Sequence, residues 1–463
     1  MISRDWTKET VLVIGTGISG IGAVSLLAEA GADIVLLEQN ETMTQEAIRA
    51  KLPEEIRMRP EIYIGILPQE AKERITRVVP SPAVPLSQPL FEEMRKKGVP
   101  IDSEIELSFA FEKGSLIAIT GTNGKTTTTS LVYAIVEAYG RKEGFSAFLV
   151  GNIGKSYALA VSGTDEKSVS VGEISSFQLE AVHDFHARVA AITNITPDHL
   201  DRHGTMEEYI RAKKQVVLNQ TKKDACVLNY EDPVLRSFGK EECPSRVIFF
   251  SSERELPEGY FVRGEQMVRR LSGEEKVLMG IHDMRLIGNC NVENVLCAMA
   301  ICEEIGIPAE DIVEAVRDFP PVEHRIEYVA TLDGVDYYND SKATNPDAAI
   351  QGIRAMTKPT FLIAGGYDKH SDYEPWIRAF GNKVKDLVLL GETAPFIEEA
   401  ARKEGIETIH TFATFEECLA YCRREAKDGD AVLLSPACAS WGMFKNYEER
   451  GKAFKAFVLE DSH

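Results

Sequence analysis

The sequence predicts an α/β protein built from three domains. A buried strand, a glycine-rich turn and a helix follow one another at residues 10–30, and the same succession recurs at residues 115–139. After Pro320-Pro321, short apolar runs again alternate with helical patterns. Strands that alternate with helices favour parallel sheets. A chain of 463 residues also exceeds the usual size of one domain.

Composition and charge narrow the classes of function. The formal net charge is −20, which is unfavourable for a general nucleic-acid binder or for a protein of anionic membranes. The first 20 residues lack the pattern of a signal peptide, and no apolar run reaches membrane-spanning length. The eight cysteines all follow residue 225 without a Cys-x-x-Cys pair, and Cys418 and Cys422 are interpreted as core or surface thiols. We expect a reducing cytoplasm and no membrane insertion.

The first predicted domain covers residues 1–104 and is Rossmann-like. A strand at 10–14 leads into a G-x-G-x-x-G turn and a helix from Ile18 to Ala30, and a second strand at 33–38 ends on Glu38. Further strand–turn signals lie at 77–82 and 99–102. The pattern predicts a nucleotide or another phosphate group at the first turn and leaves a dinucleotide open. The turn residues are Gly15, Thr16, Gly17, Ile18 and Ser19.

A phosphate loop opens the central domain, which is predicted over residues 105–321. A strand at 115–120 runs into a glycine turn and then a helix through 130–139, which is expected to stop at Gly140. Backbone N–H groups and the helix dipole there favour an anion. Lys125 would reach the outer phosphates of a nucleotide and the Thr126 hydroxyl would sit on Mg²⁺. The loop is a short variant, since Ile119 stands where the longer pattern has Gly; its residues are Gly121, Thr122, Asn123, Gly124, Lys125, Thr126 and Thr127.

Polar residues follow three further strands of this P-loop-type ATPase domain with a mainly parallel sheet. The strands are predicted at 146–150, 168–171 and 188–193, and Asn152, Glu173 and His199 come after them. Ligands bind at the carboxyl ends of such strands, and Mg²⁺ prefers oxygen, so Glu173 is the natural metal ligand. A helix near 206–218 carries Lys213 and Lys214, a pair that usually marks a solvated face.

Two asparagines open the last helix of the central domain. Residues 245–287 predict irregular strands and hairpins, and an apolar helix then runs to Ile305. Asn291 and Asn294 are three apart and would share one face at its start. Capping would explain one asparagine, but two on one face suggest a bound group.

The third predicted domain covers residues 322–463 and is again Rossmann-like. A hairpin is expected around Asp333-Gly334, and a helix after the segment 340–345. Strands are predicted at 359–364, 387–390, 407–410 and 431–434. Their ends carry two polar sets, at residues 365–369 and 435–441.

Three domains with polar strand ends suit a kinase, or a ligase that phosphorylates a carboxylate before an amine attacks it. Such chemistry needs Mg²⁺ and a lysine to neutralise charge, and it needs a closed, dry site. An NAD-binding oxidoreductase is the competing hypothesis from the first turn alone. Lys125 and Thr126 argue against it, because a dehydrogenase has no use for them. A non-enzymatic interaction protein would leave the polar strand ends unexplained.

The motifs resemble those of Mur ligases along nearly the whole chain. They are Thr120-Gly-Thr-Asn-Gly-Lys-Thr-Thr127, Gly151-Asn-Ile-Gly154, Glu173-Ile-Ser-Ser-Phe-Gln-Leu-Glu180, Asn194-Ile-Thr-Pro-Asp-His-Leu-Asp-Arg-His-Gly204, Tyr209-Ile-Arg-Ala-Lys213, His324-Arg325, Asp340-Ser-Lys-Ala-Thr-Asn345 and Leu434-Ser-Pro-Ala-Cys-Ala-Ser440. The central motifs are shared by all Mur ligases and by folylpolyglutamate synthetase. The last two are similar to those of the members that add D-glutamate.

The resemblance implies an ATP-dependent ligase that joins UDP-N-acetylmuramoyl-L-alanine to D-glutamate through an acyl phosphate, as a monomer, in peptidoglycan precursor synthesis. A sibling that adds another amino acid is the near alternative. Lys125 and Thr126 would handle ATP and one Mg²⁺ with Glu173, while His199 and a CO₂-derived carbamate on Lys213 would hold a second ion. Around adenine, ribose or phosphate the resemblance implies Asn291, Asn294, Arg325 and Asp340. For the UDP substrate it implies the first turn with Glu38, Ser81 and Asn152, and for D-glutamate it implies Lys342, Thr344, Lys369, Ser440, Trp441 and Tyr447.

The chain departs from the family pattern at three positions. Cys290 stands where the family usually has His, Ala83 where Gly is usual, and Glu38 where Asp is usual. These departures bear on the fine geometry of the UDP and adenine pockets and leave the expected class of reaction intact.

Overall fold

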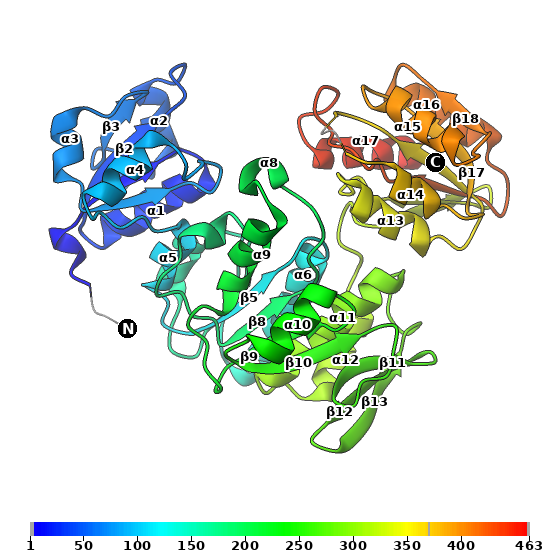
Figure 1. The fold of residues 1–463 in the computed structure, drawn as a ribbon, viewed down its shortest axis with the longest axis horizontal. Coiled ribbons are helices and arrows are strands. Elements are labelled where there is room, and N and C mark those ends of the chain that lie inside the picture. Colours follow the sequence, from blue (N-terminus) through cyan, green and yellow to red (C-terminus); the bar gives the residue numbers. More distant parts are fainter. Residues whose placement is uncertain (1–3, 369–370, 461–463) are drawn as a thin grey trace. The chain divides into compact units, whose positions relative to one another are not determined.

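The computed structural model describes residues 4–368 and 371–460, whose strands form three separate sheets (Figure 1). By backbone contacts the chain divides into two compact units. The first unit comprises residues 1–279 and 294–316, and the second comprises residues 280–293 and 317–463. The first two sheets belong to the first unit and the third sheet to the second. The predicted domain limits at 104/105 and 321/322 stay predictions.

The first sheet has four parallel strands in the order β3-β2-β1-β4. Because β1 lies between β2 and β4, the glycine turn after β1 opens at the point where the strand order reverses, which is where such sheets bind ligands. The strand expected at 99–102 is wrong: that segment makes a single bridge from Ile101 to Val78. The elements are β1 (Thr10–Ile14), α1 (Ile18–Glu29), β2 (Asp33–Glu38), α2 (Gln45–Lys51), β3 (Glu61–Ile64), α3 (Gln69–Arg74), β4 (Arg77–Pro80) and α4 (Pro89–Lys96).

The second sheet has nine strands in the order β13-β12-β11-β10-β9-β8-β5-β7-β6. The strands from β6 to β11 run parallel and β12 turns antiparallel to β11. The phosphate loop follows β5, which lies between β7 and β8 at a second reversal of strand order. The strands are β5 (Ser115–Thr120), β6 (Ala147–Gly151), β7 (Val169–Glu173), β8 (Val189–Ile192), β9 (Ala225–Asn229), β10 (Arg246–Ser251), β11 (Gly259–Arg263), β12 (Gln266–Leu271) and β13 (Glu274–Gly280).

Helices surround this sheet, and one of them ends later than the sequence predicts. Helix α6 spans Lys125–Glu143 and passes through Gly140 to end at Gly144, which has a left-handed φ of 81°. Gly140 instead allows the chain after the helix to pack closely against it. The amides of Gly144 and Phe145 both donate to its carbonyl, and a Cβ on Gly140 would lie 2.7 Å from the Phe145 carbonyl oxygen. The other helices are α5 (Glu104–Phe109), α7 (Tyr157–Ala160), α8 (Leu200–His203), α9 (Met206–Lys214), α10 (Pro233–Glu241), α11 (Asn289–Glu304) and α12 (Ala309–Asp318).

The third sheet has six strands in the order β14-β15-β19-β16-β17-β18, parallel except for the β14–β15 hairpin. Alternate residues of β16 enter two different cores, with Leu362 on one face and Phe361 on the other. The elements are β14 (Glu327–Leu332), β15 (Val335–Asn339), α13 (Pro346–Ala355), β16 (Thr360–Ala364), α14 (Glu374–Arg378), β17 (Val384–Leu389), α15 (Ala394–Lys403), β18 (Ile409–Thr411), α16 (Phe415–Glu425), β19 (Ala431–Leu434) and α17 (Tyr447–Glu460).

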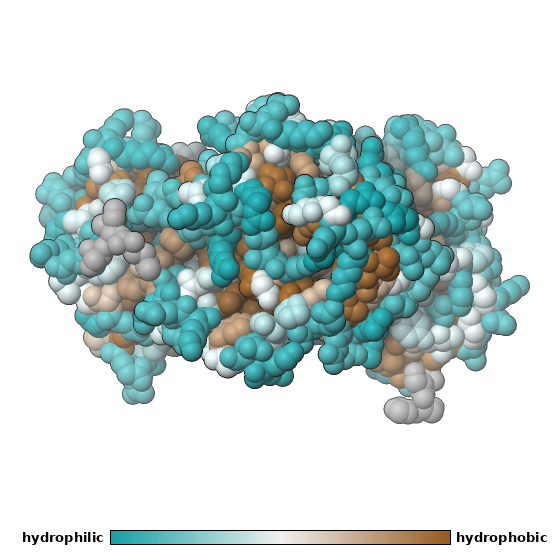
Figure 2. Space-filling view, turned by 90° about the horizontal axis from the view of Figure 1, so that it is seen from below, coloured by the Kyte–Doolittle hydropathy of each residue, from teal (hydrophilic) through white to brown (hydrophobic). Residues whose placement is uncertain are grey.

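The surface agrees with the charged composition. Figure 2 shows a face covered mainly by hydrophilic residues, with hydrophobic residues visible in the hollows between them. Within the described ranges, no helix has the length and apolarity needed to cross a bilayer. Cys418 and Cys422 are both fully buried and free on α16, as the core interpretation predicts.

Candidate active site

Two glycines give the phosphate loop its shape. Gly121 has a φ of 146°, and a Cβ there would lie 2.0 Å from the Thr193 hydroxyl oxygen. Gly124 has a left-handed φ of 84°, and a Cβ there would lie 2.3 Å from Oδ1 of Asn294. Only glycine fits at both positions, so the backbone turns tightly at the N-terminus of α6. This is the kind of turn that exposes N–H groups to a phosphate.

Two lysine amines meet at one carbonyl of this loop. Nζ of Lys125 donates to the carbonyls of Gly121 and Thr122, each at 2.9 Å. Nζ of Lys213, from α9, donates to the same Gly121 carbonyl at 2.7 Å. The fold therefore gathers both predicted catalytic lysines at the phosphate loop, although they are 88 positions apart in the sequence.

Lys213 is buried, so the solvated-face interpretation is wrong for this residue. It is 2% exposed and its amine lies 4.6 Å from the ring centre of Tyr209. Burial, reinforced by the positive charge of Lys125, lowers the pKa of Lys213 well below its ordinary value. Lys214, the next residue, instead pairs with Glu242 at 2.8 Å near the surface. The helical period separates these two neighbours onto different faces of α9.

Glu173 ends β7 beside this pair of amines. Its side chain is 4% exposed, and its Oε2 has no hydrogen-bond partner within the described ranges. Its charge, with that of Asp198, acts on Lys213 against the larger effect of burial. A buried carboxylate oxygen without a donor is costly unless a cation or another donor meets it.

Asn194 holds the phosphate loop in place, a role that the shared motif around it does not reveal. Oδ1 of Asn194 accepts the Asn123 amide at 2.8 Å, and Nδ2 of Asn194 donates back to the Asn123 carbonyl at 3.0 Å. The Thr122 hydroxyl lies 3.0 Å from the Tyr209 hydroxyl. The available signal was the position of Asn194, directly after β8, where polar strand ends face the site.

His199 lies on the same connection, next to Asp198 and before α8. Its φ of 53° is left-handed, its Nε2 lies 3.6 Å from the Asp198 carboxylate, and its ring packs edge-on against Phe177 at 4.9 Å. The side chain is 45% exposed. The connection therefore presents His199 at the surface of the first unit.

The two asparagines of α11 have different partners. Asn294 lies against the phosphate loop, where its Oδ1 accepts the Thr128 hydroxyl at 3.2 Å. Asn291 instead donates to the Ile287 carbonyl at 2.8 Å and belongs to the second unit. Asn294 is therefore the member of the pair that the structure places beside the P-loop.

The first glycine turn gathers the residues expected around UDP. A Cβ on Gly15 would lie 2.7 Å from Oγ of Ser81, and this hydroxyl is buried without a partner in the described part of the chain. Thr16 donates to one carboxylate oxygen of Glu38, and the Asn40 amide donates to the other at 2.9 Å. Burial opposes ionisation of Glu38, but these hydrogen bonds outweigh it and lower its pKa. The helix start that follows exposes Gly17, Ile18 and Ser19 to different degrees.

Asn152 follows β6 in an exposed turn. Its amide donates to the Glu173 carbonyl at 2.9 Å, so its backbone lies beside the metal candidate of the neighbouring strand. The left-handed Gly151 before it allows this close approach, because a Cβ at position 151 would lie 2.3 Å from the same carbonyl oxygen.

In the second unit, Arg325 and Asp340, two of the residues predicted around adenine, ribose or phosphate, lie close together. Nη1 of Arg325 lies 3.5 Å from Oδ1 of Asp340, and Ser435 donates to Oδ2 at 2.8 Å. Asp340 is fully buried, and burial raises its pKa to about 6 against the opposing charge of Arg325. A Cβ on Gly352 would displace this carboxylate, because it would lie 2.5 Å from Oδ2.

The residues expected around D-glutamate lie in two loops of the second unit. The Lys342 amine lies 5.4 Å from the Tyr447 ring centre, and the Thr344 amide donates to the Lys342 carbonyl at 2.9 Å. Ser440 is buried, while Trp441 is half exposed and packs against Tyr367. Lys369 lies outside the described residues.

Arg450, which no sequence motif singles out, joins these two loops. Its guanidinium is 1% exposed and donates to the Ser341 hydroxyl and carbonyl at 3.0 and 2.9 Å and to the Cys438 carbonyl at 3.2 Å. Burial lowers its pKa to about 10. An arginine on an amphipathic helix normally points to solvent, so only the fold reveals this contact.

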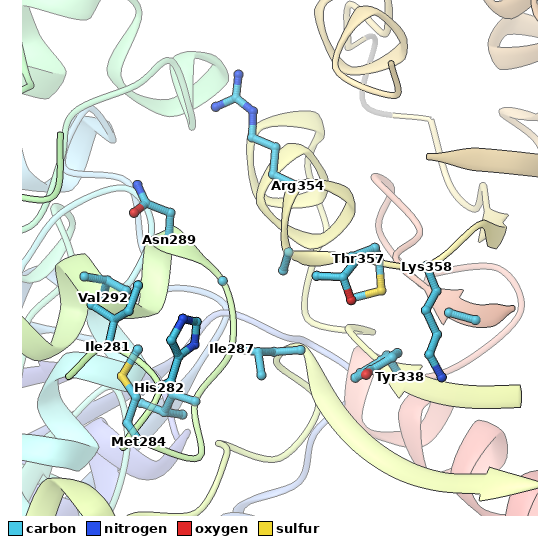
Figure 3. A pocket seen from close by; sticks show the side chains of 15 residues that line it. Ile281, His282, Met284, Ile287, Asn289, Val292, Tyr338, Arg354, Thr357 and Lys358 are labelled. Carbon is cyan, nitrogen blue, oxygen red and sulfur yellow. The ribbon is translucent and has the colours of Figure 1, made fainter. Parts of the chain in front are cut away.

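A cavity of about 520 Å³ in the second unit contains none of the predicted site residues (Figure 3). Its walls come from the segment 281–292, from β15 and from the end of α13. Figure 3 shows His282 and Met284 on one side and Tyr338 and Lys358 on the other. Lys358 is paired with Asp336 at 2.6 Å. The cavity is therefore separate from the polar strand ends.

The metal prediction rests on mixed ligands. Within the described ranges, no cluster of three or more His, Cys, Asp or Glu side chains is arranged to hold an ion. The predicted set differs from such a cluster, because it combines Thr126, Glu173, His199 and a modified Lys213. The unpartnered oxygen of Glu173 beside the loop fits a cation of the hard class.

Comparison with known proteins matches most of the chain to three domains of one family. Residues 9–103 match the Mur ligase MurD-like N-terminal domain, residues 119–302 the Mur ligase middle domain, and residues 324–438 the Mur ligase glutamate ligase domain.

Curated relatives are similar over almost the full length. The chain is 50% identical over 454 residues to the UDP-N-acetylmuramoylalanine–D-glutamate ligase of Lachnospira eligens, covering 98% of this chain and 99% of that protein. It is 48% identical to the enzyme of the same name from Lachnoclostridium phytofermentans, covering 97% of each. The crystal structure of the UDP-N-acetylmuramate–alanine ligase MurC from Thermotoga maritima has a TM-score of 0.60 at 17% identity, covering 98% of this chain and all of that one. That likeness shows the shared fold.

Proposed function

The chain belongs to the Mur ligase family, and we propose that it is the ATP-dependent ligase that joins UDP-N-acetylmuramoyl-L-alanine to D-glutamate in peptidoglycan precursor synthesis. The observation that carries the proposal is the 50% identity to an enzyme of that name along the full length of both chains. This identity extends along all three matched domains, to which the proposal assigns the UDP substrate, the nucleotide and the amino acid in chain order.

The phosphate loop supports the use of ATP. Gly121 and Gly124 leave no room for a side chain at their positions, and the turn leads directly into the N-terminus of α6, an end of a helix that favours an anion. Lys125 lies at this turn, where its positive charge would stabilise the negative charge that develops on a transferred phosphoryl group. The buried, unpartnered oxygen of Glu173 and the hydroxyl of Thr126 suit Mg²⁺, which supplies charge neutralisation when bound.

Lys213 supports the proposed carbamate. A neutral amine is the form that reacts with CO₂, and the lowered pKa of Lys213 favours that form in the free protein. The new N–C bond forms as the nitrogen loses a proton, and the product is an anion with two oxygens. With His199, such an anion would hold a second Mg²⁺.

The proposed reaction couples the formation of an amide to the cleavage of ATP, because the carboxylate is phosphorylated before the amine attacks it. The alanyl carboxylate attacks the terminal phosphorus of ATP, and ADP leaves. The amine of D-glutamate then attacks the acyl phosphate, loses a proton, and phosphate departs as the amide forms. Positioning of these groups and exclusion of water account for much of such catalysis.

Residues of the two units would position the two substrates. Around the first turn, the unpartnered Ser81 hydroxyl and the ionised Glu38 offer a donor and an acceptor to the UDP group, with Asn152 nearer the muramoyl end. Lys342, Thr344, Ser440, Trp441 and Tyr447, with Lys369, would form the D-glutamate pocket. Asn291, Asn294, Arg325 and Asp340 would contact the nucleotide. We further propose that the enzyme is a monomer and that it is cytoplasmic, and the eight free cysteines are in keeping with the second of these points.

Phosphate release tests the proposal. The purified full chain with Mg²⁺ should release phosphate only when UDP-N-acetylmuramoyl-L-alanine, ATP and D-glutamate are all present. L-glutamate, L-lysine and D-alanine should give less than about a tenth of that rate. A Lys125→Ala variant serves as the control for contaminating ATPases, and we expect it to lose most of the activity. Faster release with another amino acid would instead favour a sibling ligase. Release without any amino acid would contradict the ligase.

A further inference from the structure

We propose that Arg202 is a positioning residue. It holds the turn at Ser81, where the UDP substrate is proposed to bind, against the segment that follows Glu173 in the domain of the phosphate loop. The inference deepens the proposed function and rests on it. Arg202 lies on α8, three residues after His199, and its side chain is 14% exposed. Its guanidinium contacts segments from both sheets of the first unit.

On one side, Arg202 holds the turn that carries Ser81. Nη1 donates to the Ala83 carbonyl and Nη2 to the Val84 carbonyl, each at 3.3 Å. The turn itself is closed by a hydrogen bond of 2.9 Å from the Val84 amide to the Ser81 carbonyl. Arg202 therefore binds two carbonyls of the loop whose first residue presents a hydroxyl, without a partner in the described chain, to the Gly15 turn.

On the other side, Arg202 is tied to the segment after Glu173. Nη2 donates to the Glu180 carboxylate at 2.9 Å, and the guanidinium carbon lies 4.7 Å from the Phe177 ring centre. The Phe177 ring also contacts the rings of His199 at 4.9 Å and His203 at 5.4 Å. One planar side chain thus links the Ser81 turn to the predicted metal ligand His199.

The surroundings of residue 202 favour arginine over lysine. Glu180 is only 18% exposed, so water screens the pair weakly. A guanidinium can donate in several fixed directions and lie on an aromatic ring at the same time, which an ammonium cannot reproduce. Arg202 also lines a cavity of about 580 Å³ with Pro85, Leu86 and Ser87 of the first-sheet loop and with Arg211 of α9.

If Arg202 positions the turn, its loss should affect the UDP substrate rather than the nucleotide. In Arg202→Ala we expect KM for UDP-N-acetylmuramoyl-L-alanine to rise about tenfold and kcat to fall severalfold, while KM for ATP stays within about twofold. Arg202→Lys should give an intermediate effect, because it keeps the charge but loses the fork. Steady-state kinetics on the full chain would measure these values.

Arg211→Ala is the matched control. Arg211 lines the same cavity, but it pairs with Glu208 on its own helix and is mostly exposed. We expect its KM values to stay within about twofold of those of the unaltered chain. An equal rise in Arg211→Ala and Arg202→Ala would mean that the positive charge of the cavity matters and that anchoring of the turn does not, which would overturn the inference.

A double-mutant cycle with Ser81→Ala separates positioning from a purely structural role. If Arg202 acts through the turn, adding Arg202→Ala to Ser81→Ala should raise KM for the UDP substrate by less than about threefold. Independent, multiplying effects would contradict the coupling. Should Arg202→Ala fail to fold, Glu180→Gln provides the same test, because it keeps both carbonyl contacts and should raise the same KM to a smaller extent.

The inference and the proposed function fail in different ways. An unaltered chain that releases no phosphate with UDP-N-acetylmuramoyl-L-alanine, D-glutamate and ATP would end the proposed function. An active unaltered chain whose Arg202→Ala variant matches Arg211→Ala, or whose KM values for ATP and UDP substrate rise equally, would end only the role of Arg202.

Discussion

At the scale of single residues, the neighbours Lys213 and Lys214 have opposite surroundings. Lys213 is buried against the phosphate loop, whereas Lys214 forms an ion pair near the surface. We expect Lys213→Ala to lose at least about a hundredfold in kcat, because it removes the proposed carbamate and the donor to Gly121. Lys214→Ala should have a kcat close to that of the unaltered chain. The kcat of both variants would be measured by phosphate release.

Chemical rescue makes the Lys213 prediction specific. Acetate should partly restore Lys213→Ala, because a small carboxylate supplies the missing oxygens, and it should leave Lys214→Ala unchanged. An inactive Lys214 variant, or rescue of both variants alike, would remove the carbamate from Lys213.

The buried carboxylate of Asp340 is expected to lower the stability of the folded protein at neutral pH while it serves activity. Its folded-state pKa of about 6 exceeds its ordinary 3.8, so the folded protein binds its proton more tightly than the unfolded chain does. The stability from this group is full below about pH 3.8 and is lost as pH rises to about 6, a change on the order of 3 kcal/mol. Asp340→Asn should therefore raise the melting temperature of the second unit at pH 7.5, and the gain should shrink toward pH 4.5.

The control for Asp340 is activity. Asn keeps the shape of the carboxylate, and the Ser435 hydroxyl can turn to accept from it, but the charge beside Arg325 is lost. We expect the stabilised variant to be nearly inactive. A variant whose melting temperature shows no pH-dependent gain over the unaltered chain would mean that Asp340 is ionised at little cost.

At the scale of elements, helix α6 offers a matched pair of glycines. Gly124 precedes its first residue and Gly144 follows its last, and both have left-handed φ values, 84° and 81°. A Cβ on Gly124 would collide with Asn294, whereas a Cβ on Gly144 has no atom of another segment within 4 Å. Gly124→Ala should therefore abolish turnover, while Gly144→Ala should cost about 1 kcal/mol of stability and leave turnover unchanged.

Thermal melting and phosphate release would check both variants. Normal turnover in Gly124→Ala would show that the loop can widen without loss of function. Loss of turnover in a well-folded Gly144→Ala would move the sensitive part of α6 away from its first turn.

At the scale of the whole molecule, the two units have separate cores. The cores on the two faces of the six-stranded sheet consist of residues from the second unit. We expect calorimetry to resolve two transitions. The UDP substrate at about a hundred times its Kd should raise the transition of the first unit by roughly 5 °C and leave the other nearly unchanged. NAD at the same concentration should raise neither.

A single transition that moves as a whole would show that the units unfold together. Stabilisation by NAD without stabilisation by the UDP substrate would reverse the assignment of the first glycine turn.

The sequence by itself determined the α/β class, most strands and the class of reaction. Glycine turns after apolar strands, as at residues 10–20 and 115–125, are local signals, because a tight turn before a helix needs particular residues in order. Family motifs extended these signals to the substrates. The end of α6 cannot be read from the sequence, because Gly140 accepts hydrogen bonds from the chain that follows the helix, a contact that the local pattern does not indicate.

Only the tertiary structure decided which residues meet. It buried Lys213 and left Lys214 near the surface, it paired Arg325 with Asp340, and it brought Arg202 to the Ser81 turn. Burial, and with it the pKa of a lysine or an aspartate, depends on atoms from distant segments that pack around the group. Propensity and spacing describe neighbours along the chain, whereas a site is made by neighbours in space.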